Sequence, residues 1–514
     1  MFEGVRKRLF TIVLLINKSI QEVCVMEDLR NWIKILEDEG ELARITTEVD
    51  WNLEMGAILR KVMDNGGPAI LFENIKDYKD TISTKMFAHG LNRKTFPLAL
   101  GKPKDTKREE LSQIFADAIH NPVMYKTVET GSVKENKITG SDIDLYQFPT
   151  PLWHSPDGGR YMMTWCAAIT RDPDTGEHNV GAYRGMLTAK DQLSVLIILS
   201  QGWGVHFSKY CQRQEKMPIA VVWGYEPTLG IVAGSQIPMG MDEYKVMGAL
   251  RGEPVPLVKC ENSEIMVPAS AELVIEGYVD PNPAHYAMEG VFGEYTGYYG
   301  GARRPRHTLQ VECITHRNDP IFRGSMEGSG PGHPNENTWI YSVTSKVNFM
   351  EALERAGVPG IVDVRPGPVC YVKIRQAYNG HAKQVANALW GSWSAEWMYK
   401  ILVVVDHDID IYNHRQIDWA LCYRMEPGTH DIITMPHTRG GGLDLAEYDD
   451  TLFGTGSRGR ILLDATRDIS KAKRDQYGNL SWGPFSYDLG EPEKELIEKR
   501  WDEYGITLPE RRKR

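Results

Sequence analysis

Three short stretches of the chain contain residue types that could support catalysis or metal binding. The first is HNVGAYR, from His178 to Arg184. A guanidinium is a planar fork that binds a carboxylate through two hydrogen bonds. The amide oxygen of Asn179 is a ligand that hard divalent metals accept. If the stretch is a strand, Asn179 and Arg184 face opposite sides and would serve two different sites. An ordinary strand edge with a surface ion pair is the alternative.

The second stretch, EGVFGE from Glu289 to Glu294, places two carboxylates among glycines, and the aromatic segment YTGYYGG follows it. A carboxyl group buried against aromatic surface has a raised pKa and can hold a proton near neutral pH, as a general acid must. On a straight strand the two side chains would point apart. We therefore expect the glycines to bend the chain, so that one carboxylate fixes an arginine and the other carries the proton. A tight turn with two exposed acids is the alternative.

The third stretch, QIPMGMDE from Gln236 to Glu243, offers Glu243 as an oxygen ligand for Mn²⁺ or Mg²⁺. By itself this signal is no stronger than any acid near a turn.

The motifs GxxxxGK[ST], GxSxG and HExxH do not occur in the sequence. Phosphate-loop NTPases, α/β-hydrolases and HExxH proteases therefore have no support.

Composition limits the class of protein that must position these residues. The chain has 514 residues, of which 42% are hydrophobic and 25% charged, with a formal net charge of -10. These values are typical of a globular protein with two to four domains, and the acidic balance argues against a nucleic-acid partner. The seven cysteines form no CxxC pair. This pattern favours a reducing, cytoplasmic location, and no segment is apolar enough to predict a membrane span.

The pattern along the chain predicts a mixed α/β protein with several regions. An amphipathic helix is expected from Asp28, with Leu29, Trp32, Ile33 and Leu36 at helical spacing. Short β-rich runs dominate the middle of the chain, where a helix is expected only near Glu272–Glu276. Strand, helix and strand are expected in turn for VCYVKI, GHAKQVANALWGSW and KILVVVD. The expected regions are a leader (1–25), an N-terminal α/β region (26–125), a β-rich domain (126–325), a linker (326–350) and a C-terminal α/β domain (351–514).

The first 25 residues have a basic start and an apolar run from Leu9 to Ile16, but no small-residue cleavage site follows. We interpret them as an upstream start or a disordered leader, with Met26 as the more natural beginning. The sequence does not decide whether residues 1–25 belong to the natural protein.

Several segments in fixed order resemble the UbiD-like decarboxylases. They are NxxxxR, IPxGxxE, EGxFGEYTGYY and KILVVVDxDIDIYN, together with PAILFENIKDY near the start and GEPVPLVKC at 252–260. The resemblance extends from about Met26 to the end of the chain. It implies a reversible, non-oxidative decarboxylase that acts on an aromatic or heteroaromatic acid with prenylated FMN. Loss of CO2 leaves a carbanion-like centre, for which no side chain is an adequate electron sink, so an organic cofactor is expected.

The resemblance also implies roles for individual residues. Glu294 would be the proton donor and acceptor, and Glu289 with Arg184 would position the carboxylate. Asn179 and Glu243 would bind the divalent metal, Mn²⁺ or Mg²⁺, that anchors the flavin phosphate, with K⁺ as a further candidate ion. The implied flavin contacts are Thr164, Asn179, Arg184, Gln201, Glu243 and Lys400.

One position departs from the family pattern. The third metal ligand of the family is usually a histidine, and the matching position here is Gly202. His206 lies four residues further on, one helical turn away, and is a candidate substitute. Water as the third ligand, with His206 as a structural residue, is the alternative.

The implied fold has an N-terminal α/β region, a central split β-barrel that carries the flavin, and a C-terminal α/β oligomerisation domain. Expected partners are the acid, CO2, a flavin prenyltransferase that supplies the cofactor, and further copies of the chain in a homodimer or homohexamer. Two other functions stay open: an FMN-dependent oxidoreductase on the same barrel, and an inactive flavin-binding subunit.

The sequence names neither the acid nor the physiological direction. The loop from Gly328 to Asn337 carries His333, and a second glycine-rich stretch carries His437. If these histidines line the pocket, they offer hydrogen bonds to a ring hydroxyl or heteroatom, which favours a hydroxylated aromatic or heteroaromatic acid over a cinnamic acid. Loop stabilisation outside the pocket is the alternative for both.

Overall fold

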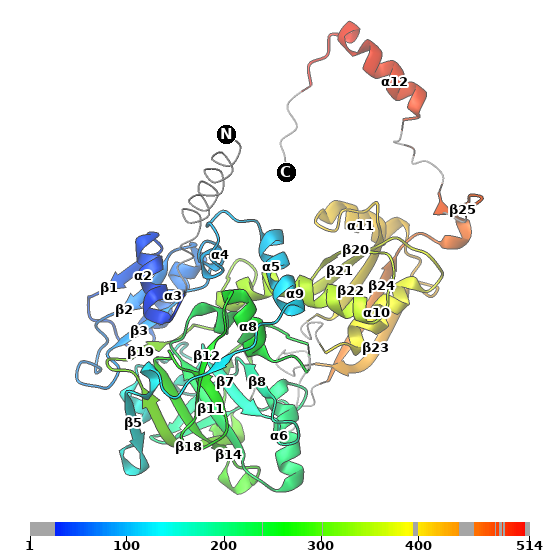
Figure 1. Ribbon diagram of the computed structural model, residues 1–514. Coiled ribbons are helices and arrows are strands. Elements are labelled where there is room, and N and C mark those ends of the chain that lie inside the picture. Colours follow the sequence, from blue (N-terminus) through cyan, green and yellow to red (C-terminus); the bar gives the residue numbers. More distant parts are fainter. Residues whose placement is uncertain are drawn as a thin grey trace, which may run out of the picture.

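The structure is a computed structural model that describes residues 26–508, apart from 239, 301, 394–398, 441–456, 478–479, 483–485 and 487–488. The expected leader, 1–25, lies outside the described residues. The chain folds into an N-terminal lobe, a central β-rich body and a C-terminal α/β unit (Figure 1). This is the mixed α/β fold with three regions that the sequence predicts. No helix in the described part of the chain is long and apolar enough to cross a bilayer.

The N-terminal lobe begins with the predicted helix α2 (Leu29–Asp38), which buries the expected apolar face. Asp28 caps it by accepting a 2.8 Å hydrogen bond from the backbone N–H of Asn31. The lobe also contains a four-stranded sheet of order β1-β2-β3-β19, whose last strand comes from the far end of the central region. Its elements are β1 (Leu42–Ile45), α3 (Glu54–Asp64), β2 (Ala69–Phe72), β3 (Lys85–Ala88), α4 (Thr95–Ala99), α5 (Arg108–His120) and β19 (Ile321–Arg323).

The central body is built on a curled ten-stranded sheet. Its main path is β6-β9-β10-β18-β14-β11-β7-β8, with β5 and β15 paired to the long strand β18. A smaller sheet of β13, β12 and β4 lies beside it. The strands are β4 (Lys126–Thr127), β5 (Asn136–Thr139), β6 (Tyr161–Met163), β7 (Ala167–Arg171), β8 (His178–Gly181), β9 (Gly185–Ala189), β10 (Gln192–Val195), β11 (Met217–Trp223), β12 (Pro256–Lys259), β13 (Met266–Pro268), β14 (Leu273–Val279), β15 (Ala287–Glu289), β16 (Phe292–Gly293), β17 (Tyr299–Gly300) and β18 (Arg304–His316).

The prediction of a helix near Glu272–Glu276 is wrong. This segment belongs to strand β14, which pairs with β11 and β18. Aliphatic and β-branched residues facing both neighbours favour the strand. Three helices of the central body were not predicted: α6 (Gly202–Arg213), α7 (Pro227–Ala233) and α8 (Glu243–Arg251). α7 is buried along its whole length, so it lacks the amphipathic period that identifies a surface helix.

The C-terminal unit is a five-stranded sheet of order β20-β21-β22-β24-β23 with helices packed on it. The predicted strand, helix and strand are confirmed as β21, α10 and β22. The elements are β20 (Ile361–Arg365), β21 (Val369–Ile374), α10 (His381–Gly391), β22 (Ile401–Asp406), α11 (His414–Tyr423), β23 (Ile432–Arg439) and β24 (Ser457–Ala465), followed by β25 (Lys473–Arg474), β26 (Leu480–Ser481) and α12 (Glu491–Arg500).

The segment expected as a linker, 326–350, is mostly helical. Helix α9 (Glu336–Arg355) begins inside it and extends beyond it. Ile340 and Val343 of α9 pack into the core shared by the N-terminal lobe and the central body, whereas Phe349 and Leu353 pack into the core of the C-terminal unit. The helix therefore contributes side chains to two cores, in addition to linking the two regions.

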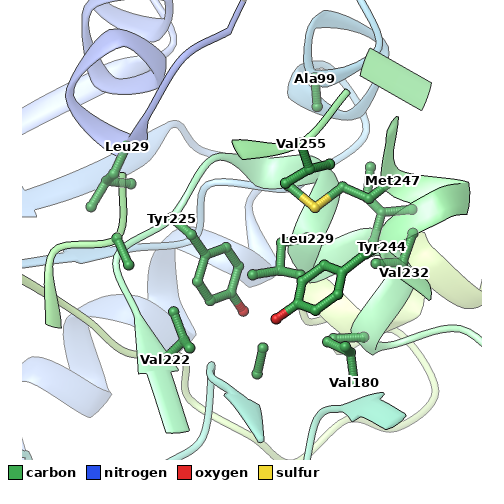
Figure 2. Close-up of a cluster of buried hydrophobic side chains, with 14 of the residues drawn as sticks. Leu29, Ala99, Val180, Val222, Tyr225, Leu229, Val232, Tyr244, Met247 and Val255 are labelled. Carbon is green, nitrogen blue, oxygen red and sulfur yellow. The ribbon is translucent and has the colours of Figure 1, made fainter. Parts of the chain in front are cut away.

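A buried apolar cluster holds strand β8 against helix α8. Val180 of β8 lies in the same cluster as Tyr244 and Met247 of α8, and Figure 2 shows these side chains around a common space. The hydroxyl of Tyr244 donates to the backbone carbonyl of Met266 at 2.9 Å, which satisfies its one polar group. Since strand neighbours alternate in direction, burial of Val180 turns Asn179 toward the other face.

Candidate active site

Arg184 lies between the two carboxylates that the sequence singled out. Its Nη2 donates to Oε2 of Glu289 at 3.0 Å, its Nε lies 3.0 Å from Oε1 of the same residue, and its Nη1 contacts Oε1 of Glu294. All three residues are buried. The alternatives of a surface ion pair and of a turn with exposed acids are therefore excluded.

The expected bend between the two glutamates is present. Glu289 ends β15, Glu294 directly follows β16, and Gly290 between them has a φ of 93°. A side chain is disfavoured at this φ, which explains the glycine. The bend turns both carboxylates toward Arg184, which lies in the short loop between β8 and β9.

Aromatic side chains pack around this cluster. Tyr161 donates from its hydroxyl to Oε1 of Glu289 at 2.8 Å, and the ring of Phe292 lies under the Arg184 guanidinium at 5.4 Å. Burial raises the pKa of Glu294, although the positive charge of Arg184 acts in the opposite direction. A raised pKa is the direction that a general acid needs, and it makes Glu294 a candidate proton donor.

The cluster forms one wall of a cavity, which we call the Arg184 cavity. Arg184, Phe292 and Glu294 line it from the central body, and Asn337 and Tyr341 line it from helix α9. Thr164 also lines this cavity, and its hydroxyl accepts from the backbone N–H of Ser325 at 3.1 Å. A concave site with a few converging polar groups is the usual form of a small-molecule site.

A second cavity adjoins the first, and we call it the Glu243 cavity. Both cavities are lined by Gln201 and by Tyr183, while Asn179 and Glu243 line only the second. Trp393 reaches this second cavity from the C-terminal unit. The structure thus places two predicted flavin contacts, Thr164 and Gln201, and the predicted metal ligands Asn179 and Glu243 on two cavities that share lining residues.

Asn179 and Glu243 fit a divalent cation. The carboxyl of Glu243 is partly buried and accepts a 3.3 Å hydrogen bond from the backbone N–H of Val180, and its desolvation raises its pKa to about 8. A partly desolvated carboxylate that accepts from a backbone N–H is further stabilised by a cation beside it. In the described part of the chain, no three His, Cys, Asp or Glu side chains converge as metal ligands. The Asn179 amide oxygen is therefore needed for such a site.

Gly202, the position that departs from the family pattern, lies against the side chain of Asn179. A Cβ at Gly202 would lie 1.7 Å from Oδ1 of Asn179, so this position has no space for a histidine as the side chains stand. His206, one turn further along α6, lines a third cavity together with Asn179 and Glu243. Its Nδ1 lies 2.9 Å from the Thr170 hydroxyl. His206 is thus near the candidate metal site, but it is engaged with its own neighbours.

Three predicted residues lie away from these cavities. Lys400, which precedes β22, lines none of the three. His333 does not line any of these cavities: its side chain is 59% exposed, and Nδ1 lies 3.0 Å from Oδ1 of Asp64 on helix α3. His437 is exposed on β23 and lines none of these cavities either. The tertiary contact with Asp64 could not be foreseen from the loop sequence around His333.

Sequence reasoning also missed residues that do line the cleft. Asn337 and Tyr341 lie on α9, where a loop and linker were expected, and Trp393 follows α10. Glu327 lines the Arg184 cavity and immediately precedes the glycine-rich loop that was singled out. A carboxylate beside that loop was the available signal for Glu327.

Family models match most of the chain. Family models of 3-octaprenyl-4-hydroxybenzoate carboxy-lyase match three stretches: the UbiD N-terminal domain at 33–115, the Rift-related domain at 126–330 and the C-terminal domain at 338–465. Together they cover most of the chain.

Solved structures of related enzymes have the same fold. Vanillic acid decarboxylase of Sedimentibacter hydroxybenzoicus in its closed form is 28% identical, with 94% of this chain and 99% of that chain covered and a TM-score of 0.79. Its open form gives a TM-score of 0.70. The UbiD-class enzyme HmfF of Pelotomaculum thermopropionicum, in complex with FMN, is 29% identical over 86% of this chain and 94% of that chain, with a TM-score of 0.69. The chain therefore belongs to the UbiD family of carboxy-lyases.

Proposed function

We propose that this protein catalyses the reversible, non-oxidative decarboxylation of an aromatic or heteroaromatic acid with prenylated FMN. The observation that carries the proposal is the buried arginine held between two glutamates at the wall of the Arg184 cavity. HmfF is described in complex with FMN and, in an evolved dimeric form, with prenylated FMN, and vanillic acid decarboxylase acts on an aromatic acid.

The chain's own groups divide the work. Arg184 offers a fixed guanidinium to the substrate carboxylate, and Glu289 holds it in place with the help of Tyr161. Glu294, whose pKa is raised by burial, delivers a proton to the carbon that loses CO2. In the carboxylation direction the same carboxylate removes that proton.

Thr164, Gln201 and Asn179 line the cleft where the flavin would lie. Prenylated FMN, when bound, supplies the electron sink for the developing carbanion. Asn179 and Glu243 would hold Mn²⁺ or Mg²⁺ against its phosphate, with His206 or water as a further ligand. Because Gly202 replaces the usual histidine, we expect weaker metal binding here than a site with three protein ligands would give.

Spectroscopy and an acid panel test the proposal together. The protein is purified from cells with and without a co-expressed flavin prenyltransferase, and the released cofactor is identified by mass and absorption spectrum. Each preparation is then incubated with aromatic and heteroaromatic acids, and CO2 release is measured. We expect CO2 release only from protein carrying the prenylated cofactor. Oxidation of a nicotinamide by protein carrying plain FMN, without CO2 release, would instead support the oxidoreductase alternative.

A further inference from the structure

A second carboxyl group, that of Glu327, lines the Arg184 cavity beside that of Glu294, and the sequence predicted no role for it. It lies between β19 and α9, is buried, and shares this cavity with Arg184 and Glu294. The negative charge of Glu294 contributes to raising the pKa of Glu327, after the larger effect of burial. A buried carboxyl is uncommon in proteins unless it is paired or has a function.

Two asparagines hold the Glu327 side chain in place. Asn335 donates from Nδ2 to Oε2 at 3.0 Å, and Asn337 donates from Nδ2 to Oε1 at 2.9 Å. Asn335 is itself fixed, because its Oδ1 caps helix α9 by accepting from the backbone N–H of Thr338 at 3.0 Å. The carboxyl is thus oriented by a helix terminus, as a specificity group must be.

The side chain retains capacity for one more hydrogen bond. No ion-pair partner of Glu327 occurs among the described residues, and burial raises its pKa to about 8, with the Glu294 charge adding to the effect. A protonated carboxyl has one O–H to donate and free lone pairs to accept with. Both capacities match a phenolic hydroxyl, which also donates and accepts.

We infer that Glu327 is a substrate-recognition residue whose carboxyl hydrogen-bonds a ring hydroxyl of the acid held by Arg184. This inference deepens the proposed function, on which it rests, and names the substrate class as a hydroxylated aromatic acid. It replaces His333 by Glu327 as the group that selects for the ring substituent, because Glu327 lines the cavity and His333 lies outside it.

The test uses two acids of similar size, 4-hydroxybenzoic acid and 4-methylbenzoic acid. Each acid is tested on the wild type and on the variants Glu327→Leu and Glu327→Gln. Dissociation constants are measured calorimetrically on protein loaded with plain FMN, where no turnover is needed, and kcat/KM is measured on protein with the prenylated cofactor. Glu327→Gln keeps the shape but places an N–H₂ group against an asparagine N–H₂, so it is the variant to use if Glu327→Leu fails to fold. Glu351→Gln, a buried glutamate of α9 that does not line this cavity, is the matched control.

We expect the wild type and Glu351→Gln to prefer the hydroxylated acid about tenfold or more, and both Glu327 variants to lose most of that preference. An unchanged preference in a folded Glu327 variant would overturn the inference. An equal loss of affinity for both acids would also overturn it, because that result indicates a role toward Glu294 or the cofactor. A wild type that binds both acids equally well would overturn it too. If the binding preference behaves as expected but no acid releases CO2, recognition by Glu327 stands and the proposed decarboxylation fails.

Discussion

The guanidinium of Arg184 contacts both oxygens of the Glu289 carboxylate, with Nη2 and Nε each 3.0 Å from one of them. Its remaining nitrogen contacts Glu294. The single positive charge of Arg184 therefore contacts two buried acids, through two nitrogens to Glu289 and through one to Glu294. Burial raises the pKa of Glu294 although this positive charge acts in the opposite direction.

Glu294→Gln is expected to abolish turnover while flavin binding stays intact. The amide keeps the size and a hydrogen-bond acceptor for Arg184 but cannot transfer a proton. Loss of a general acid lowers kcat by about 10²–10⁴-fold. Steady-state kinetics with flavin absorbance of the purified variant give the answer, and a Gln variant with the kcat of the wild type would remove Glu294 from the mechanism.

Arg184→Lys is expected to lose activity as well, although the charge is kept. An ammonium is a point charge and cannot contact both oxygens of Glu289 and one of Glu294 at the same time. We expect kcat/KM to fall by at least about a hundredfold, comparable with the removal of one preorganised donor. Thermal unfolding of the variant separates this effect from misfolding, and near-normal kinetics would rule out a geometric role for the guanidinium.

Tyr161→Phe tests the support of Glu289. The tyrosine hydroxyl donates to Oε1 of Glu289 at 2.8 Å, and its loss removes one donor from a buried carboxylate. A hydrogen bond to a charged group is worth about 1.5–3 kcal/mol, so we expect kcat/KM to fall about tenfold or more with cofactor binding unchanged. Equal activity of the Phe variant and the wild type would show that Arg184 alone holds Glu289.

Glu243→Ala is expected to lose the divalent metal and the flavin together. The carboxyl lines the Glu243 cavity together with Asn179 and accepts a hydrogen bond from the backbone N–H of Val180. Metal analysis and flavin absorbance of the purified protein are the readouts, and Glu264→Ala, an exposed acid paired with Lys259, is the control. Full flavin occupancy without metal in the Glu243 variant would contradict the bridging role.

His307 is expected to destabilise the fold at acidic pH. It is fully buried between the rings of Phe207 and Tyr286, and burial lowers its pKa from 6.5 to about 3. The unfolded chain binds a proton below about pH 6.5 that the folded chain does not bind, so stability falls as the pH decreases from that value toward 3. At pH 4.5 the contribution is about 2–3 kcal/mol.

The measurement for His307 is the change in Tm between pH 7 and pH 4.5 in wild type and His307→Gln. The decrease in Tm between pH 7 and pH 4.5 should be smaller in His307→Gln than in the wild type, even if the two proteins differ in Tm at pH 7. His285→Gln, an exposed histidine paired with Asp280, should behave as the wild type does. An identical pH dependence in all three proteins would show that His307 is not held neutral by the fold.

The sequence by itself determined the local elements and the residue types of the site. Apolar residues at helical spacing identified α2, and continuous aliphatic runs identified β21 and β22, because these signals depend only on neighbouring residues. The glycines around Glu289 and Glu294 required a bend, since a straight strand would separate the two carboxylates. The fixed order of motifs indicated the family, which the comparisons confirm.

Only the tertiary structure decided which polar groups share a cavity. Arg184 and Glu294 are 110 positions apart in the chain, and His333 meets Asp64 across 269 positions, so no local pattern distinguishes the first contact from the second. The buried helix α7 and the shared helix α9 depend on surfaces contributed by distant segments. Glu327 shows the same limit: its burial and its two asparagine partners exist only once α9 is packed against the central body, and they change an ordinary glutamate into a candidate specificity residue.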